Sequence, residues 1–223
     1  MKSPSFRQFA LGVLLAATAG FASAQDAPRT TWEGLELTKV KGLDTVYIRP
    51  KAQIAAYKTV QLNPSRVEFA KLWEQHAKGF EHQPTAEDME RIKSKLAELL
   101  RETFAKELRE HKYAIVDSPL EDTLLVSASI VDLYINAPDV GGTGKANSYT
   151  TGAGRMTLVL ELRDAPTGQL LARVIDERED TNADGSMQWT NAATNEADAR
   201  RIIQGWATRL RKGLDGLQNK QSS

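Results

Sequence analysis

A long two-stranded pattern between Arg155 and Asp180 constrains the fold of this chain more than any other stretch. Every second residue from Met156 to Leu162 is apolar, and the residues between them are largely polar. Such alternation is typical of a strand with one face on a core. Residues 164–168 supply turn chemistry, with Pro and Gly, and a second β-prone run over 169–179 follows at hairpin distance. The stretch therefore predicts a long antiparallel hairpin.

Several other segments also favour strands. Short β-prone runs occupy 44–50, 57–62, 66–69 and 113–117, and a long one covers 123–136. In the long run, Asp132 falls among apolar residues, so we expect it near the exposed end of the strand. The segments 138–154, which is Gly-rich, and 181–195, around Trp189, are expected to be a connector and a loop.

Two segments have the apolar spacing of helices. The first follows Thr85 and Asp88, which resemble a capping box, and it carries apolar residues at three- and four-residue spacing up to Leu108. The second follows Asn195, an N-cap candidate, and its apolar stripe ends at Leu217. Together these elements predict an α+β fold: a single mixed, largely antiparallel sheet with two amphipathic helices packed on it.

The N-terminal residues predict export. A basic start at Lys2 and Arg7 precedes a short apolar run, and Ala22-Ser23-Ala24 resembles a cleavage site. We therefore expect residues 1–24 to be a signal peptide cut after Ala24, and a periplasmic mature protein. An uncleaved membrane anchor is the alternative, although the run is shorter than a bilayer span requires. Residues 25–43 are expected to form an extended arm pinned by Trp32, residues 44–217 one domain, and residues 218–223 a disordered tail.

Composition excludes several classes of function. The chain has no cysteine, so disulfides, thiolate metal sites and a cysteine nucleophile are excluded. Removing Lys2 and Arg7 with the signal peptide leaves 27 basic against 29 acidic side chains, a formal charge of −2. This balance argues against general nucleic-acid binding, which needs a basic excess. No segment after the signal peptide is apolar enough to predict a transmembrane span.

Motifs for small ligands and metals are incomplete. Residues 139–145 suggest a phosphate loop but lack its first Gly and its final Ser or Thr. Residues 180–185 match half of a calcium loop, but the Glu expected at the twelfth position of such a loop is replaced by Asn191. His76, His82 and His111 lack metal-binding spacing. We therefore expect no cofactor and no metal site.

Two groups of charged side chains are candidates for chemistry or recognition. Glu161, Asp176 and Glu177 on the predicted hairpin could serve acid–base catalysis on glycans if two of them share a cleft. Outward positions on a half-exposed strand explain them more simply. The last helix carries a set of cations that fits either an anionic partner or the helix dipole: Arg200, Arg201, Arg209, Arg211 and Lys212. The sequence identifies no catalytic residue.

Several strings of this chain resemble a bacterial envelope family of unknown function, the domain of unknown function 3313. They are YIRP at 47–50 followed by Tyr57, PTAEDMERIKSKLAELLRETF at 84–104, and GRMTLVLELRDAPTGQLLARV at 154–174. The resemblance covers Leu43 to Leu217. Many members look like lipoproteins with a cysteine after the signal peptide, where this chain has Gln25. The resemblance implies an envelope location and brings no catalytic or binding residues with it.

These observations favour a non-enzymatic periplasmic protein that binds or supports an envelope protein or a cell-wall component. The predicted architecture is similar to that of small accessory domains of cell-envelope systems, which is an analogy at the level of fold. Two alternatives remain open: a glycan- or peptide-acting hydrolase that uses hairpin carboxylates, and a small-ligand carrier with an apolar pocket beneath the helices. The sequence leaves the partner and the oligomeric state open.

Overall fold

The computed structural model describes residues 27–79, 83–111, 113–135, 148–150, 154–180, 188–190 and 192–221. The strands are β1 (Glu36–Thr38), β2 (Thr45–Ile48), β3 (Thr59–Leu62), β4 (Arg66–Phe69), β5 (Ala114–Ile115), β6 (Thr123–Ile135), β7 (Ser148–Thr150), β8 (Gly154–Asp164), β9 (Leu170–Asp180) and β10 (Gln188–Thr190). The helices are α1 (Lys71–His76), α2 (Ala86–Glu110) and α3 (Ala192–Gln221), with 3₁₀ turns η1 (Ile54–Ala56) and η2 (Ala77–Gly79).

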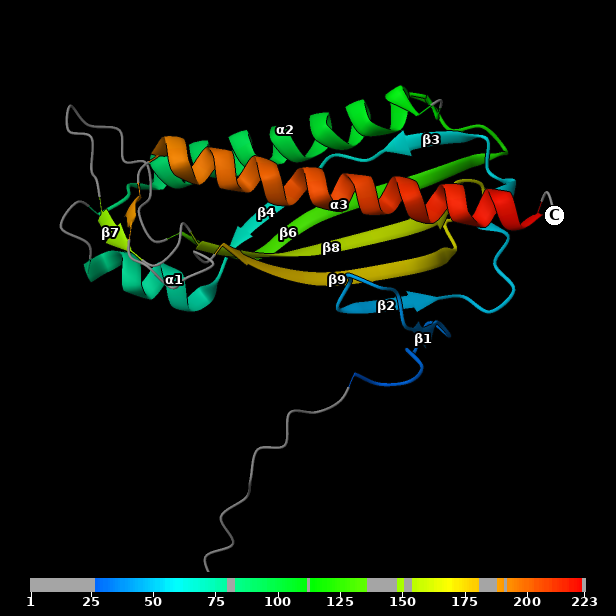
Figure 1. The fold of residues 1–223 in the computed structure, drawn as a ribbon, viewed down its shortest axis with the longest axis horizontal. Coiled ribbons are helices and arrows are strands. Elements are labelled where there is room, and N and C mark those ends of the chain that lie inside the picture. Colours follow the sequence, from blue (N-terminus) through cyan, green and yellow to red (C-terminus); the bar gives the residue numbers. More distant parts are fainter. Residues whose placement is uncertain are drawn as a thin grey trace, which may run out of the picture.

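Within the described residues, eight strands form one mixed sheet in the order β1-β2-β9-β8-β6-β3-β5 (Figure 1). Strand β4 also joins it, because the long β6 pairs with β3 along its first half and with β4 along its second. Strand β3 runs parallel to both β5 and β6, and β4 runs parallel to β6. The other pairs are antiparallel, so the sheet confirms the predicted α+β class.

The predicted hairpin lies at the centre of this sheet. Strands β8 and β9 pair antiparallel from Gly154 opposite Asp180 to Leu162 opposite Ala172. The apolar set from Met156 to Leu162 is buried, as the alternation predicts. At the turn, Gly168 has a φ of +68°, which glycine adopts without steric cost.

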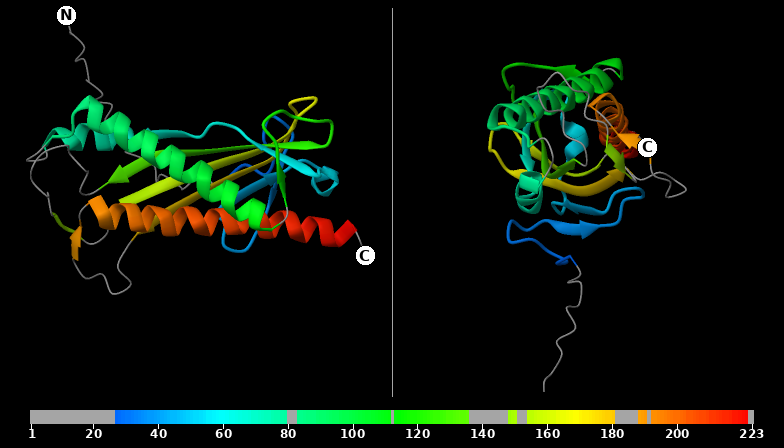
Figure 2. Two further views of the ribbon diagram at one scale, coloured as in Figure 1. Left: turned by 90° about the horizontal axis from the view of Figure 1, so that it is seen from above. Right: turned by 90° about the vertical axis from the view of Figure 1, so that its left-hand side faces the viewer.

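Two long helices, α2 and α3, lie side by side over one face of the sheet (Figure 2). Helix α2 begins with the predicted capping box: the Asp88 N–H donates to Thr85 Oγ1 over 3.1 Å, and the Thr85 N–H donates to Asp88 Oδ2 over 3.0 Å. Both helices contribute to one buried cluster with the sheet, including Phe104 of α2 and Trp206 of α3. Burial of these faces is the main source of helix stability here.

Asp132 is exposed near the end of β6, as expected. Its φ is +52°, and the pairing of β6 with β8 shifts register between Val131 and Tyr134. This irregularity is a β-bulge, which turns one side chain out of the regular alternation. The bulge explains how a strand whose neighbouring residues pack on the core can carry a charged residue.

The N-terminal arm is pinned differently from the prediction. The Trp32 side chain is 92% exposed, so the expectation that it holds the arm is wrong. Leu35 is fully buried instead, in a small cluster with Tyr47 and Leu170. Strand β1, which follows Leu35, then pairs with β2 and extends the sheet. Backbone pairing brings Leu35, rather than the larger Trp32, over the sheet.

Three predicted irregular segments contain regular structure. The 138–154 connector includes β7 and the 181–195 loop includes β10, and these two strands pair with each other. Each of these strands is distant from its partner in sequence, so local composition does not reveal the pair.

Helix α3 starts at Ala192, which places Asn195 inside it, and it continues to Gln221, beyond the predicted domain end at 217. A single Gly costs a helix only about 1 kcal/mol, and burial of residues such as Leu214 offsets that cost.

Candidate binding groove

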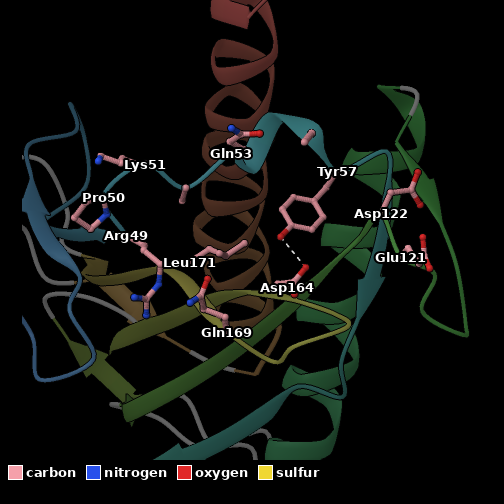
Figure 3. Close-up of a pocket in the computed structure, with 12 residues that line it drawn as sticks. Arg49, Pro50, Lys51, Gln53, Tyr57, Glu121, Asp122, Asp164, Gln169 and Leu171 are labelled. Atoms are coloured by element: carbon pink, nitrogen blue, oxygen red, sulfur yellow. Dashed lines mark hydrogen bonds between the residues drawn. The ribbon is translucent and has the colours of Figure 1, made fainter.

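An open groove of about 430 Å³ lies at the turn end of the β8–β9 hairpin (Figure 3). Its walls come from the segment after β2, from the segment between η1 and β3, from the loop before β6, and from the hairpin turn. The lining residues are Arg49, Pro50, Lys51, Ala52, Gln53, Ala56, Tyr57, Glu121, Asp122, Asp164, Gln169 and Leu171.

The first wall is fixed by the end of β2. The Arg49 N–H donates to the Leu171 carbonyl over 2.7 Å, which continues the pairing of β2 with β9. The Arg49 guanidinium donates to two further carbonyls, those of Leu170 at 2.7 Å and Glu33 at 2.9 Å. Pro50 then ends the strand, and Lys51 has a φ of +63°, a conformation that side chains other than glycine rarely adopt. The backbone thereby turns away from the sheet and leaves the Lys51 side chain exposed.

The floor of the groove contains a tyrosine–carboxylate pair. The Tyr57 hydroxyl donates to Asp164 Oδ1 over 2.9 Å, and the Thr167 N–H donates to Asp164 Oδ2 over 3.0 Å. The Thr167 hydroxyl also donates to Asp164 Oδ2. The hydrogen bonds from Thr167 and Tyr57 lower the pKa of Asp164 despite its partial desolvation. Burial, together with the Asp164 carboxylate, raises the pKa of Tyr57 to about 12. At neutral pH the pair is therefore a phenol donor and a carboxylate.

The two sides of the groove carry opposite charges. Lys51 lies on one side and Glu121 and Asp122 on the other, as Figure 3 shows. None of these three side chains has a hydrogen-bonding or ionic partner among the described residues, and all three are solvent-accessible. Two amides, from Gln53 and Gln169, line the space between them. The arrangement can bind a ligand or peptide segment that carries both charges and several polar groups.

The hairpin carboxylates do not share a cleft. Asp176 is fully buried on the helix-covered face, where it accepts a hydrogen bond from Trp206 Nε1 over 2.7 Å. Glu161 lies on the opposite face, paired with Arg163 at 2.8 Å and Arg173 at 2.7 Å. Burial alone would raise the pKa of Glu161, but these two arginines outweigh it and lower the pKa. Glu177 is exposed on the same side of the sheet as Glu161.

The other predicted candidates are not brought together into a site. The 139–145 segment, His82 and most of the 180–185 segment lie outside the described residues. His76 Nδ1 lies 3.1 Å from the Tyr134 hydroxyl, and His111 Nδ1 lies 2.8 Å from the Glu107 carbonyl at the end of α2. The described part of the chain contains no group of three or more His, Asp or Glu arranged to hold a metal ion.

The cations of α3 are largely engaged within the protein. Arg200 pairs with Glu196 and Arg201 with Asp198, each within one turn of the helix. Arg211 contacts two carboxylates, Glu107 of α2 at 3.3 Å and Asp215 at 2.8 Å. These ion pairs favour the interpretation that the basic residues stabilise α3 and its contact with α2.

Sequence patterns do not predict the groove. Its charged residues lie in three separate connections, at Lys51, at Glu121 and Asp122, and in the turn at Asp164. They become neighbours because β2 pairs with β9 and β3 pairs with β6. The periodicity of a local segment does not predict the order of strands in a sheet. The positive φ of Lys51 has no sequence signal either. Only the Pro50 strand stop marks the position.

Neither long helix in the described part of the chain contains an apolar window long enough to cross a bilayer. Among curated proteins, none matches the chain. Solved structures that resemble it include the PelC dodecamer from Paraburkholderia phytofirmans, at 15% identity, with 78% of this chain and 96% of that chain covered and a TM-score of 0.35. A candidate lipoprotein from Caulobacter crescentus CB15 matches at 12% identity, with coverages of 76% and 94% and a TM-score of 0.36. Similarity at this level supports no inference about function or assembly.

The comparison with protein families covers far more of the sequence than the individual motifs do. The model of the family described as "Protein of unknown function (DUF3313)" matches residues 23–210. The matched region includes helix α2, the first part of helix α3 and all the strands of the described structure, and it contains every groove residue. The chain belongs to this family of unknown function, DUF3313.

Proposed function

We propose that this protein is exported to the periplasm, where it acts without catalysis as a binding or accessory protein of the cell envelope. The observation that carries the binding role is the groove, whose charged side chains at Lys51, Glu121 and Asp122 are accessible and make no contact with each other. Exposed charged groups contribute little to the stability of a fold, so these three side chains can serve recognition without a cost to folding. Unpaired groups of both signs around one concavity suit recognition of a polar partner.

The placement of the hairpin carboxylates supports a role without catalysis. A glycosidase needs two carboxyl groups that face one substrate, about 5 to 10 Å apart across it. Asp176 and Glu161 lie on opposite faces of the sheet, and each is occupied by donors of the protein itself. The groove lining includes neither histidine nor serine. Glu161, Asp176 and Glu177 therefore do not form the pair of facing carboxylates that the hydrolase alternative requires of them.

Export is supported by the N-terminal sequence and is tested directly. We expect the protein recovered from the periplasm to begin at Gln25, which intact-mass spectrometry measures. The control is a variant with Ala22→Leu and Ala24→Leu, which removes the small residues that signal peptidase needs and should retain the full N-terminus. Recovery of the full-length chain in the cytosol would contradict this part of the proposal.

The binding role is tested by photo-cross-linking in cells. A photoreactive amino acid replaces Gln53, which is exposed on the groove wall, and in a control strain it replaces Glu98, which is exposed on α2. We expect one envelope component to cross-link from position 53 and not from position 98. A combined Lys51→Gln and Asp122→Asn change should reduce that adduct. Equal cross-linking from both positions would contradict a partner in the groove.

A carrier of small ligands is the second candidate, and the dimensions of the groove favour it. Ligand sites usually have volumes of about 300 to 1,000 Å³, and the groove falls in this range. Its polar lining favours zwitterionic compounds over the apolar ligands that the sequence analysis considers. Thermal unfolding with a panel of amino acids and dipeptides tests this: a rise in Tm that Lys51→Gln abolishes supports a carrier.

A further inference from the structure

The N-terminal hairpin, residues 29–41, presents apolar side chains to solvent. Trp32 is 92% exposed, and Leu37 and Val40 are each 39% exposed. Tryptophan combines a large apolar area with one polar group, and soluble proteins usually bury most of it. The hairpin therefore carries an apolar surface that the described fold leaves uncovered.

This exposure is built into the fold, because the hairpin around Trp32 is held firmly. The Thr31 N–H donates to the Leu35 carbonyl over 2.9 Å, and Leu35 itself is fully buried. Glu33, next to Trp32, forms an ion pair with Arg173 at 2.8 Å, and its carbonyl accepts the hydrogen bond from Arg49. The residues on both sides of Trp32 are thus anchored while its own side chain points outward.

The hairpin also carries an excess of positive charge. Arg29, Lys39 and Lys41 are exposed and have no ionic partner among the described residues. The hairpin has two acids; Glu33 is engaged by Arg173, which leaves Glu36 against three cations. Exposed tryptophan with basic residues beside it is the composition that prefers the interface of a membrane with anionic headgroups.

The position of the hairpin in the chain matches this chemistry. It is the first described element after the N-terminal segment, whose apolar run 9–21 would be in the membrane during export. Strand β1 lies at the edge of the sheet, away from α2 and α3 (Figure 1). Until the predicted cleavage after Ala24, a chain that enters its folded domain through this hairpin therefore holds Trp32 close to the lipid surface.

We propose that the N-terminal hairpin docks on a membrane surface rich in anionic phospholipid. Trp32, with the apolar groups of Leu37 and Val40, enters the interfacial region, and the cations contact headgroup phosphates. This contact is peripheral and separate from the groove, which is formed by other residues. A protein partner at the same surface is the competing explanation, and the experiment separates the two.

The test measures co-sedimentation of the exported protein, with its N-terminus verified by mass, on vesicles of 30% phosphatidylglycerol in phosphatidylcholine. We expect binding to these vesicles that falls at least tenfold on vesicles of phosphatidylcholine alone, and also in 500 mM salt. Trp32→Ala should weaken binding about tenfold, and Lys39→Gln with Lys41→Gln should do the same. Leu120→Ala, at another exposed apolar residue, and Lys71→Gln with Lys95→Gln are the matched controls and should bind normally.

A spectroscopic readout locates the contact. Brominated phospholipid in the vesicles should quench the tryptophan emission of a Trp189→Phe protein but quench a variant with both Trp32→Phe and Trp189→Phe much less, because the two tryptophans that remain, Trp73 and Trp206, are buried in the core. An absence of vesicle binding, or equal binding by Trp32→Ala, would overturn the proposal. A protein cross-linked from position 32 in cells, without vesicle binding, would assign the hairpin to a protein partner and leave the proposed role of the groove intact.

Discussion

Each face of the β8–β9 hairpin holds a cluster of carboxylates and arginine, but the two clusters differ in their exposure to solvent. On the helix-covered face, Asp176 is completely buried and its carboxylate accepts hydrogen bonds from the Asp44 N–H, Arg178 and Trp206, at 2.7 to 2.9 Å. On the open face, Arg173 joins Glu161 to Glu33, and these three side chains are 13 to 23% exposed. Both clusters attach the N-terminal part of the chain to the central hairpin.

The difference between the clusters concerns what replaces a lost partner. Water can reach the open-face network, so a group that loses its ion pair there is partly resolvated, and the net contribution of each pair is modest. Asp176 and Trp206 are buried, so the Trp206 indole N–H would stay desolvated without its acceptor, whereas Arg178, which is 32% exposed, would regain some water. Asp176, a catalytic candidate in the sequence analysis, thus connects the loop at Asp44, strand β9 and helix α3.

The largest expected effect is at Asp176. Asp176→Ala leaves the Trp206 indole N–H and the Asp44 N–H without their acceptor, and it removes the charge that faces Arg178. Breaking a buried ion pair from one side costs about 3 to 5 kcal/mol, and the 32% exposure of Arg178 places the expected loss at the lower end, about 3 kcal/mol. Urea unfolding followed by circular dichroism should show a loss of this size. Glu177→Ala, on the adjacent exposed residue, is the control and should change the free energy of unfolding by less than about 0.5 kcal/mol.

A conservative variant at the same position separates the loss of charge from the loss of both acceptor oxygens. Asp176→Asn keeps an oxygen acceptor for Trp206 or Asp44 but brings an N–H donor and no charge, so its loss of stability should fall between those of the normal protein and Asp176→Ala. If Asp176→Ala were as stable as Glu177→Ala, the buried cluster around Asp176 would make no measurable contribution to stability.

On the open face, we expect a smaller loss for Arg173→Ala. The guanidinium donates to Glu161 Oε1 over 2.7 Å and to Glu33 Oε1 over 2.8 Å, and Glu161 retains Arg163 when Arg173 is removed. Charged hydrogen bonds of this kind contribute about 1 to 2 kcal/mol when partly exposed. The same urea series measures the loss. Arg66→Ala, at an exposed arginine without a side-chain partner among the described residues, is the control.

Much of the fold follows from the sequence because strand and helix periodicity record which side chains face the core. The alternation up to Leu162 and the capping box at Thr85 predict β8 and the start of α2 directly. The same alternation in β9 puts Asp176 on the side of Val174, facing the core. Treating Asp176 as an outward residue overlooks this parity, which is the one signal that could have identified the buried cluster.

The groove and the N-terminal hairpin could not be predicted in this way. Lys51, Asp122 and Asp164 meet because of strand order, which local patterns do not encode. For the hairpin, side-chain size favours Trp32 as the anchor, whereas the pairing of β1 with β2 places Leu35 on the sheet. In both regions the pairing of strands determines which side chains come together, and composition only shows which residues are available.

Acidification should weaken the open-face cluster. The pKa of Glu161 is lowered below its ordinary value of 4.5, because its arginine hydrogen bonds outweigh the effect of burial. A carboxyl with a lowered folded-state pKa contributes stability above the unfolded pKa, and this contribution is lost as pH falls through the folded value. Urea unfolding at pH 7, 4 and 3 should therefore show a decline in stability below pH about 4.5 that is smaller in Glu161→Gln. An identical decline in both proteins would remove Glu161 as a source of the pH dependence.

The smallest expected effect is at the hairpin turn, where Asp164 belongs to neither cluster. Tyr57→Phe removes one donor to this carboxylate, while Thr167 continues to satisfy it, so we expect a loss of about 0.5 to 1 kcal/mol. The interaction has a second signature, because the pKa of Tyr57 is raised to about 12 by burial and by Asp164. A raised folded-state pKa means that the stability is present below the unfolded value of 10 and is lost as pH rises through 12. Ultraviolet titration of the tyrosines should show a late-ionising component that Tyr57→Phe diminishes. A component unchanged by the substitution would mean that the Tyr57–Asp164 pair does not persist in solution, and the floor of the groove would then be open to solvent.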